Sequence, residues 1–387
     1  MTASTWDLSI DEFLKRNEVC VLGLPFDPLT EQQALENIVA SAQQKRPCFF
    51  STPNLNFVVS SLSSALFFDS VCASNLSVAD GMPLVLVSKL MGENLPERVS
   101  GSGLFEHVMN RKEDQSISVF FFGGDPGVGE EAAAKLEHAD NGLLAAGFLD
   151  PGRGSVDDMS SASVIEQINN ANPDFIVVAL GAAKGQEWIL SNKDKLNAPV
   201  VSHLGAVINF VAGNIKRAPE FWQKLGLEWV WRTLQEPRLA KRYAQDGLCF
   251  LLLLAKTVIP LTIYKKIRWS SLASRELTYS LNKSENDSQL TLSLSGAATQ
   301  DSLPELKQAI AERMVNPLSL EIKLEELTYG DGYFFAFLLR LHTMLSKEGQ
   351  NLHISGASKP VVRLAQLYLL SKERWQALVT QNNLSGT

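Results

Sequence analysis

Between Cys20 and Leu204, short apolar runs alternate with stretches of helical pattern. Strands are expected at Cys48–Ser51, Ser118–Phe122, Phe175–Leu180 and Pro199–His203. A helix is expected from Thr30, which can form a capping box with Gln33, and another over residues 130–138. Near-continuous apolar strands that alternate with helices predict an α/β domain with a mostly parallel sheet. In such a sheet ligands bind beyond the carboxyl ends of the strands, so residues that follow a strand are the first candidates for chemistry.

The pattern changes after residue 212, where a basic, tryptophan-rich segment begins. Apolar residues recur there near the helical period, with lysines and arginines between them: Trp222, Leu225, Trp229 and Leu234. This arrangement is typical of a helix in the membrane interface, with aromatic rings at the headgroups and cations toward anionic lipid.

Residues 246–269 approach the length of a membrane span, but Lys256 interrupts the middle and Pro260 should break the helix. We therefore predict a basic, membrane-associating helical appendage over residues 213–269 that lies on the membrane or dips into it. A spanning helix and a helix buried against a neighbouring domain are the alternatives.

A second, smaller α/β domain is predicted in the C-terminal part of the chain, after a polar segment that is interpreted as a linker. The expected strands are Leu290–Leu294, Leu318–Leu324 and Asn351–Ile354. Three helices are expected: one that begins after Ser302, one over Tyr333–Ser346 and one over Lys359–Leu370. The predicted division is 1–212 for the first α/β domain, 213–269 for the appendage, 270–289 for the linker and 290–387 for the second domain.

Composition and charge narrow the function. With 387 residues, 45% of them hydrophobic and 20% charged, the chain is long enough for two globular domains. The net charge of −7 argues against nucleic acid as a partner, because nucleic-acid binding needs a cationic surface. The four cysteines form no Cys-x-x-Cys pair, so buried free thiols are expected. Residues 1–15 contain acids and no apolar run, unlike a signal peptide, which indicates a cytoplasmic protein.

Polar residues follow two of the early apolar runs. Thr52 and Asn54 come directly after Ser51, and they could present a hydroxyl and an amide to a ligand or cap the next helix. Asp80, which precedes a glycine, is either a turn residue or a carboxylate at the edge of the sheet. Arg98 could hold a phosphate through both terminal nitrogens, or pair with a neighbouring glutamate.

A glycine-rich loop, Gly123–Gly129, follows an apolar strand and opens a helix. Its glycines would let backbone amides approach a phosphate, but the spacing matches neither a Walker loop nor a dinucleotide fingerprint. The sequence has no Asp-x-Asp pair, the usual metal clamp for a nucleotide-sugar diphosphate, and its five histidines form no metal-ligand cluster. If the donor is a nucleotide-sugar, cations after Lys216 would have to stabilise its leaving diphosphate.

Taken together in order and spacing, these segments resemble the WecG/TagA/CpsF family, glycosyltransferase family 26. The matching stretches are TPN (Thr52–Asn54), ADGMP (Ala79–Pro83), PERVSG (Pro96–Gly101), FFGGDPGVGEEAAAKL, GAAKGQEWI (Gly181–Ile189) and AGNIKRAPEFWQKLGLEWVWRTLQEPR (Ala212–Arg238). The resemblance covers roughly Val19 to Tyr243, and we expect a Rossmann-like catalytic domain. It implies an inverting, metal-independent transfer of a sugar from a UDP-sugar to an undecaprenyl-diphosphate-linked saccharide in polysaccharide biosynthesis. No cofactor is expected, and the enzyme would act at the inner face of the cell membrane.

The resemblance also implies roles for individual residues. Asp80 would be the general base that removes the proton from the acceptor hydroxyl. The other residues with an implied catalytic role are Thr52, Asn54 and Arg98. The implied substrate-binding residues are Gly123, Gly124, Gln186, Arg232, Arg238 and Arg242, of which the last three would neutralise UDP. The chain departs from the family at Leu239, where a second arginine is usual, and at Lys184-Gly185, where Pro-Lys is usual. The sugar stays open between N-acetylmannosamine, its uronic acid and glucose.

The C-terminal domain resembles a STAS domain, the fold of anti-sigma-factor antagonists, through LEELTYGDGYFFAFLLRLHTMLSKEGQNLHISGAS. Members of that family carry a phosphorylatable Ser or Thr in the loop before a helix, where this chain has Tyr329-Gly330-Asp331-Gly332. The resemblance therefore implies an interaction or assembly role, with a protein partner, and no phosphorylation switch.

Two other functions account for parts of the pattern. A nucleotide-binding oxidoreductase would explain the glycine-rich loop but leaves the basic, tryptophan-rich segment unexplained. A STAS-based regulatory or scaffold protein with a degenerate nucleotide-binding domain would explain the C-terminal domain. It does not explain why Thr52, Asn54, Asp80 and Arg98 are all present.

Overall fold

The computed structural model describes residues 10–111, 116–137, 142–215, 218–219, 221–222, 226–272, 275–284, 289–314 and 318–379. The chain divides into two compact units. Among the described residues, unit 1 comprises 29–85 and 96–248, and unit 2 comprises 10–28, 86–95 and 249–379. Two short segments from the first hundred residues therefore belong to the same unit as the C-terminal domain.

The centre of unit 1 is a six-stranded parallel sheet with the strand order β4-β3-β8-β7-β5-β6. Its strands are β3 (Cys48–Ser51), β4 (Leu76–Ser77), β5 (Ile117–Gly123), β6 (Leu143–Leu149), β7 (Phe175–Ala179) and β8 (Val200–His203). The predicted parallel α/β sheet is confirmed, and all four expected strands are present. The sequence pattern did not indicate β6, because this edge strand is rich in small residues and leaves Leu144 and Phe148 exposed.

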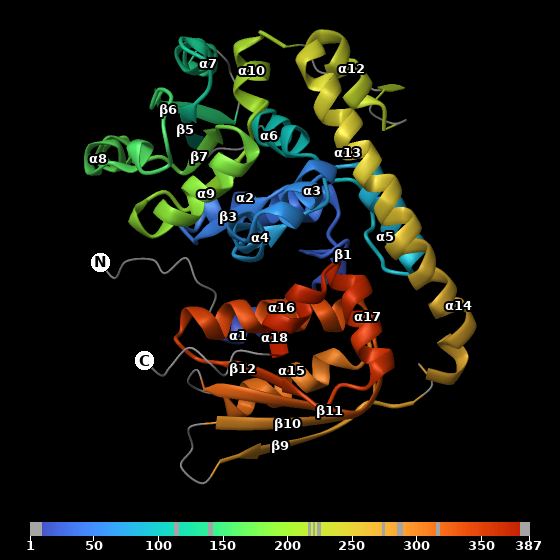
Figure 1. Ribbon diagram of the computed structural model, residues 1–387. Helices are drawn as coiled ribbons and strands as arrows, with labels where there is room; N and C mark the ends of the chain where they lie inside the picture. The colour runs from blue at the N-terminus through green and yellow to red at the C-terminus, as the bar shows by residue number, and fades with distance from the viewer. Residues whose placement is uncertain are drawn as a thin grey trace. The chain divides into compact units, whose positions relative to one another are not determined.

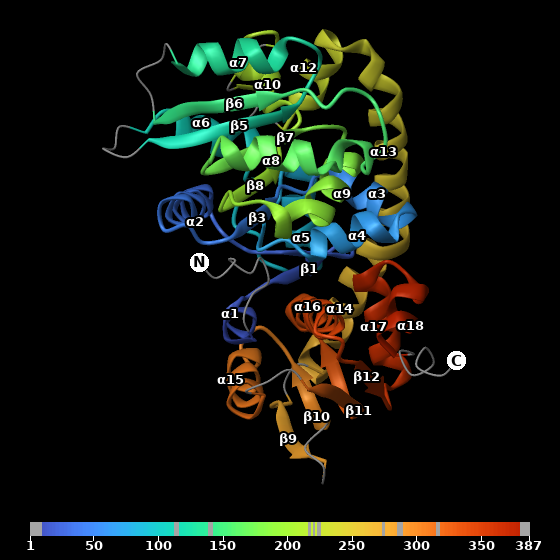
Figure 2. The same ribbon diagram turned by 90° about the vertical axis from the view of Figure 1, so that its left-hand side faces the viewer.

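Helices cover both faces of this sheet, with α7 and α10 on one face and α8 and α9 on the other (Figure 2). The helices are α2 (Glu31–Gln43), α3 (Leu55–Ser63), α4 (Ala65–Cys72), α5 (Met82–Met91), α6 (Gly101–Met109), α7 (Val128–Glu137), α8 (Ala162–Asn170), α9 (Ala182–Asn192), α10 (Val207–Ala212) and α12 (Glu228–Gln235). The predicted capping box is confirmed, since Gln33 N donates to Thr30 Oγ1 and Thr30 N donates to Gln33 Oε1.

After α12 the chain forms one long helix (Figure 1). It consists of η3 (Pro237–Leu239), α13 (Ala240–Leu253), the π-helical turn η4 (Leu254–Val258) and α14 (Ile259–Leu272). The expectation that Pro260 would break this helix was wrong. The π-helical turn directly before Pro260 alters the backbone hydrogen-bond spacing where proline lacks an amide hydrogen, so the helix continues. Among the described residues, Pro237–Ile267 is long and apolar enough to cross a membrane, with a mean hydropathy of 1.9.

Unit 2 contains a four-stranded sheet with the order β12-β11-β10-β9, in which β9 is antiparallel and the other strands are parallel. Its strands are β9 (Thr278–Lys283), β10 (Gln289–Ala298), β11 (Ser319–Gly330) and β12 (Leu352–Ser355), and its helices are α15 (Leu303–Arg313), α16 (Gly332–Lys347), α17 (Lys359–Leu369) and α18 (Lys372–Val379). The interpretation of 270–289 as a linker was wrong, because α14 extends to Leu272 and β9 follows. As an exposed edge strand, β9 lacks the apolar alternation that revealed β10.

The N-terminal segment of unit 2 packs on α16. It comprises α1 (Ile10–Lys15) and a hairpin of β1 (Val19–Val21) and β2 (Leu24–Phe26). The two-residue turn places Leu22 and Gly23 at positive φ, the backbone that a tight hairpin requires. Beside the hairpin, the buried Arg340 of α16 donates to both carboxylate oxygens of Glu18, at 2.7 and 2.6 Å. The hairpin is therefore tied to the C-terminal domain by apolar packing and by a buried ion pair.

Candidate functional site

A cavity of about 420 Å³ opens at the carboxyl edge of the parallel sheet in unit 1. It is lined by residues that follow strands β3, β4, β7 and β8, as well as by residues from α12 to α13. The predicted site residues among them are Thr52, Asn54, Asp80, Arg232, Arg238 and Arg242. The structure thus brings two distant parts of the sequence together around one cavity.

The loop after β3 places its polar side chains by capping the following helix. Asn54 Oδ1 accepts hydrogen bonds from Asn56 N at 3.0 Å and from Phe57 N at 3.3 Å, so Asn54 is the N-cap of α3. It also lines the cavity, so the N-cap interpretation is confirmed and a contact of its amide with a ligand stays a prediction. A Cβ atom at Gly101 would lie 3.0 Å from Thr52 Oγ1 and 2.5 Å from Leu204 Cδ2. Glycine is therefore needed where α6 approaches this loop.

Asp80 is placed beside this loop by backbone hydrogen bonds. Asp80 N donates to Pro53 O at 2.9 Å, and Val99 N donates to Ala79 O at 2.9 Å. These bonds connect the segments that follow β3 and β4 with the segment that carries Arg98. Asp80 is thus a carboxylate at the edge of the sheet that lines the cavity, which decides between the two interpretations of its sequence context.

Arg98 joins two acidic residues that line the cavity. Its Nη1 and Nη2 atoms each donate to Glu228 of α12 at 2.9 Å, and its Nε donates to Asp80 Oδ1 at 3.3 Å. The alternative pairing of Arg98 with a neighbouring glutamate is not seen, because Glu97 instead accepts a hydrogen bond from Glu31 N.

Burial has the largest effect on the pKa of Asp80. Loss of solvation raises the pKa of Asp80 above its ordinary value, the positive charge of Arg98 opposes that rise, and the negative charge of Glu228 adds to it. Burial also lowers the pKa of His203, which lines the same cavity and whose Nε2 lies 2.7 Å from Leu180 O. His203 is therefore neutral near pH 7, and Asp80 is a stronger base than an ordinary aspartate.

The appendage brings arginines and a second glutamate to the cavity. Glu236 accepts a hydrogen bond from Arg238 Nη2 at 3.0 Å and lies 3.6 Å from Arg232 Nη2. Asn56 Nδ2 donates to Asp246 at 3.1 Å, which holds α13 against the first turn of α3. The cations that were predicted to face a diphosphate are therefore at the cavity, with a carboxylate between two of them.

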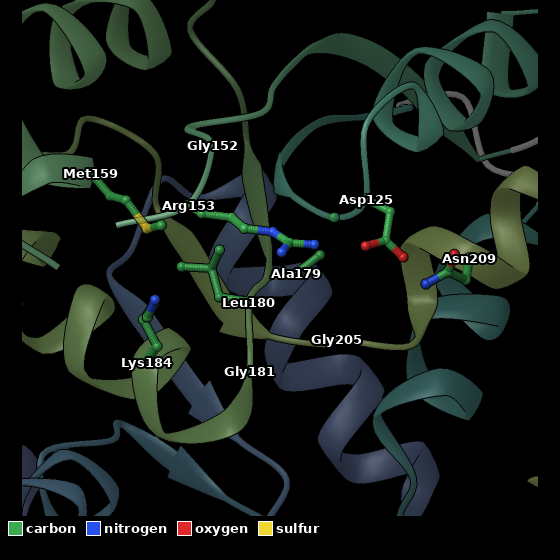
Figure 3. Close-up of a pocket in the computed structure, with 11 residues that line it drawn as sticks. Asp125, Gly152, Arg153, Met159, Ala179, Leu180, Gly181, Lys184, Gly205 and Asn209 are labelled. Carbon is green, nitrogen blue, oxygen red and sulfur yellow. The ribbon is translucent and has the colours of Figure 1, made fainter. Parts of the chain in front are cut away.

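A second cavity, of about 410 Å³, adjoins the first (Figure 3). The two share Leu180, Gly181, Gly205 and Asn209 as lining residues. Gly124 lines the second cavity, and Figure 3 shows the Arg153 guanidinium and the Asp125 carboxylate directed into it. Lys184 also lines it and donates to Gly154 O at 2.6 Å. This cavity combines a glycine loop with two cations, which suits a phosphate-containing ligand.

Two predicted substrate-binding residues do not line either cavity. Gln186 is fully buried, and its Nε2 donates to Ser51 Oγ at 3.1 Å. It supports the end of β3 directly before Thr52. Gly123 has a φ of 93°, and a Cβ there would lie 3.0 Å from Ala179 O, so this glycine permits close packing against β7. The expectation that these two residues contact substrate is corrected accordingly.

Sequence reasoning missed several lining residues: Glu228, Glu236, Arg153, Lys184, His203 and Asn209. Two signals were available, since His203 ends an expected strand and the basic segment contains three glutamates, among them Glu228 and Glu236. Arg153 had no signal, because it lies in a loop after the unpredicted strand β6.

Comparisons with known proteins identify relatives for both parts of the chain. A family model described as "Glycosyl transferase WecG/TagA/CpsF family" matches residues 19–262, and one described as "Mlab, STAS domain" matches residues 281–380. A protein of Staphylococcus aureus (strain MRSA252) is 27% identical over 232 residues, which are 59% of this chain and 88% of that protein. A protein of strain MW2 is 26% identical over 234 residues, which are 59% of this chain and 89% of that protein. Both are named N-acetylglucosaminyldiphosphoundecaprenol N-acetyl-beta-D-mannosaminyltransferase.

Proposed function

Because the chain belongs to the glycosyl transferase WecG/TagA/CpsF family, we propose that it transfers a sugar from a UDP-sugar to an undecaprenyl-diphosphate-linked saccharide. The transfer would invert the anomeric centre and serve the synthesis of a cell-surface polysaccharide. The observation that carries the proposal is a partly buried carboxylate, Asp80, in one cavity with three arginines of the appendage. N-acetylmannosamine is the first sugar to test, because the named relatives transfer it.

The chemistry follows from where each group lies. The acceptor hydroxyl attacks the anomeric carbon of the donor, Asp80 takes the hydroxyl proton, and the bond to UDP breaks on the opposite face. A carboxylate whose pKa is raised is a better proton acceptor than an ordinary aspartate, and the Arg98 guanidinium beside it favours its ionised form. Thr52 and the Asn54 amide nitrogen would hold substrate, because both residues line the cavity beside the base.

Cations on either side of the reacting centre would stabilise the departing diphosphate. Arg232, Arg238 and Arg242 line the first cavity, and Arg153 and Lys184 line the second. Positive charges beside the leaving group stabilise the negative charge that develops as UDP leaves. We propose that the second cavity, with Gly124 at its edge, receives the nucleotide, and that the first receives the acceptor.

We propose that the enzyme is held at the cytoplasmic face of the membrane by one side of its long helix. In unit 2, exposed aliphatic side chains gather on α5, α13 and α14: Leu86, Leu90, Leu251, Leu252, Ile259, Ile263 and Ile267. The opposite side of the same helix is buried at Thr257, Val258 and Leu261. A helix that packs protein on one side and exposes an apolar stripe on the other suits the membrane interface better than a span.

The C-terminal domain is proposed to have an assembly role. Asp331 caps α16 by accepting from Phe334 N at 3.0 Å, and Gly332 N donates to Glu93 at 3.2 Å. Glu93 lies in the segment that matches the glycosyltransferase family model, and its carboxylate also accepts hydrogen bonds from Lys265 and Tyr368. The loop that carries a phosphorylation site in STAS relatives is thus covered within unit 2, which supports a structural role for this domain.

The proposal is tested by offering the purified chain a panel of UDP-sugars with undecaprenyl-diphosphate-N-acetylglucosamine in detergent or liposomes. The expected result is one UDP-sugar that yields an acceptor product heavier by one sugar residue, with release of UDP. A chain that releases UDP from no member of the panel and elongates no acceptor contradicts the proposal.

A further inference from the structure

The guanidinium of Arg98 is divided unequally between two carboxylates. Glu228 takes both terminal nitrogens at 2.9 Å each, whereas Asp80 receives only the Nε hydrogen at 3.3 Å. A two-pronged contact between arginine and a carboxylate is the stronger of these geometries, both in energy and in orientation. All three side chains are largely shielded from solvent, with 16% of Arg98, 24% of Glu228 and 26% of Asp80 exposed.

We propose that Glu228 is a positioning residue that restrains Arg98, so that one carboxylate oxygen of Asp80 is left open to the acceptor hydroxyl. The proposal rests on the proposed function, in which Asp80 is the base. Within the described part of the chain, no hydrogen bond is seen on Asp80 Oδ2, and Asp80 lines the cavity. Arg98 therefore orients the base through one oxygen while the other oxygen can receive a proton.

The alternative arrangement shows why a second carboxylate is useful. Without Glu228, the fork of Arg98 would be free to close on Asp80, the remaining carboxylate beside it. A two-pronged pair would occupy both oxygens and weaken the base, since a cation in direct contact favours the ionised form of an acid. Glu228 prevents this by holding the fork on α12.

The charged groups around Asp80 shift its pKa in opposite directions. Arg98 and Arg232 lower the pKa of Asp80, and Glu228 raises it. His203 in the same cavity is neutral near pH 7 because burial lowers its pKa. Loss of the Glu228 charge therefore shifts the pKa of Asp80 downward, first by removing a negative neighbour and then by releasing Arg98.

Local structure fixes Glu228 for this task. It lies in the first turn of α12, where the helix dipole favours a negative side chain. The next acid of the appendage, Glu236, lies after the end of α12 and pairs with Arg238 and Arg232 instead. Glu236 is therefore a matched control: it has the same charge and lies at the same cavity, but it makes no contact with Arg98.

The test compares Glu228→Gln, Glu228→Asp, Glu236→Gln and Asp80→Asn in the full chain, measuring kcat and kcat/KM for transfer as a function of pH. We expect Glu228→Gln to move the acidic limb of kcat/KM to lower pH by on the order of one unit, and to lower kcat at pH 7 by about tenfold. Glu228→Asp should recover part of both effects, and Glu236→Gln should leave the acidic limb in place.

The outcomes separate this inference from the proposed function. Suppose that Asp80→Asn is inactive and that the acidic limb of Glu228→Gln lies where that of the wild type lies. Glu228 then does not restrain Arg98, and the inference is overturned. If Glu228→Gln does not fold, Glu228→Asp is used for the same comparison. A uniform loss of activity at every pH in a folded Glu228→Gln would overturn it equally. Transfer by Asp80→Asn at the wild-type rate would instead show that Asp80 is not the base, and this would contradict the proposed function as well.

Discussion

The exposed stripe on α14 allows the membrane contact to be tested quantitatively. Ile259, Ile263 and Ile267 are 53%, 52% and 72% exposed, and their spacing of four residues places them on one side of the helix. Thr262 Oγ1 donates to Leu90 O at 2.8 Å, which places α14 beside α5, where Leu86 and Leu90 are also exposed. We expect the triple replacement of the three isoleucines by serine to release the protein from membranes.

The size of the effect follows from the exposed area. Burying a whole isoleucine side chain contributes about 1.5–3 kcal/mol, so burying roughly half of one contributes about 1 kcal/mol. Three such side chains give about 3 kcal/mol, which corresponds to a reduction of about 100-fold in the membrane partition coefficient. The polar face is unchanged by the substitutions, so the attraction of its cations to anionic lipid should stay the same.

The assay is co-flotation of the full chain with liposomes that contain anionic lipid, with the melting temperature as a check that each variant is folded. A matched control is Leu144→Ser, which removes an exposed leucine from the edge strand β6 of unit 1 and should not change partitioning. Carbonate extraction of native membranes should release the wild-type protein, because an interfacial helix does not span the bilayer. A triple variant that floats as the wild type does, or a wild type that resists carbonate, would refute this reasoning.

Two further predictions concern the stability of unit 2. Arg340→Met leaves Glu18 buried with Arg16 as its remaining partner at 2.9 Å. The free energy of unfolding, measured in urea, should therefore fall by about 3 kcal/mol. An unchanged urea midpoint would mean that the Arg340–Glu18 pair does not stabilise the fold. Burial and the nearby Glu93 raise the pKa of Asp331 from 3.8 to about 7. The folded state therefore holds a proton that the unfolded state releases, and this stabilising contribution should be lost as the pH rises from about 4 to about 7. Asp331→Asn should flatten that part of the stability profile, and a variant with the wild-type slope would exclude Asp331 as its source.

The sequence predicted the elements whose side-chain pattern is shaped by burial. The four central strands of unit 1 and the capping box at Thr30 follow directly from local chemistry, and both were confirmed. The edge strands β6 and β9 were missed because partly exposed strands do not need a continuous or alternating apolar pattern. The edge strand β4 was missed because its two residues are too few to show any pattern. Pro260 was misjudged because a π-helical turn before it accommodates the missing amide hydrogen.

Some residues of the candidate site could likewise be predicted from the sequence, and others could not. Residues beside strand ends, such as Thr52 and Asp80, could be predicted because parallel strands present their carboxyl ends at one edge. The pairing of Arg98 with Glu228 could not be predicted, since the two are 130 positions apart and only the fold brings them together. Gln186 was assigned to the cavity, but its amide supports Ser51 instead, a role that depends on side-chain direction.

The most direct test of the central claim is the transfer rate of Asp80→Asn measured beside its affinity for UDP. Asparagine has the shape of aspartate but cannot take up the acceptor proton, so product formation should fall by at least about 100-fold. UDP affinity, measured by calorimetry, should change less than twofold, because the arginines that would hold the nucleotide are untouched. A variant that elongates the acceptor at a near-normal rate would contradict the assignment of Asp80 as the base.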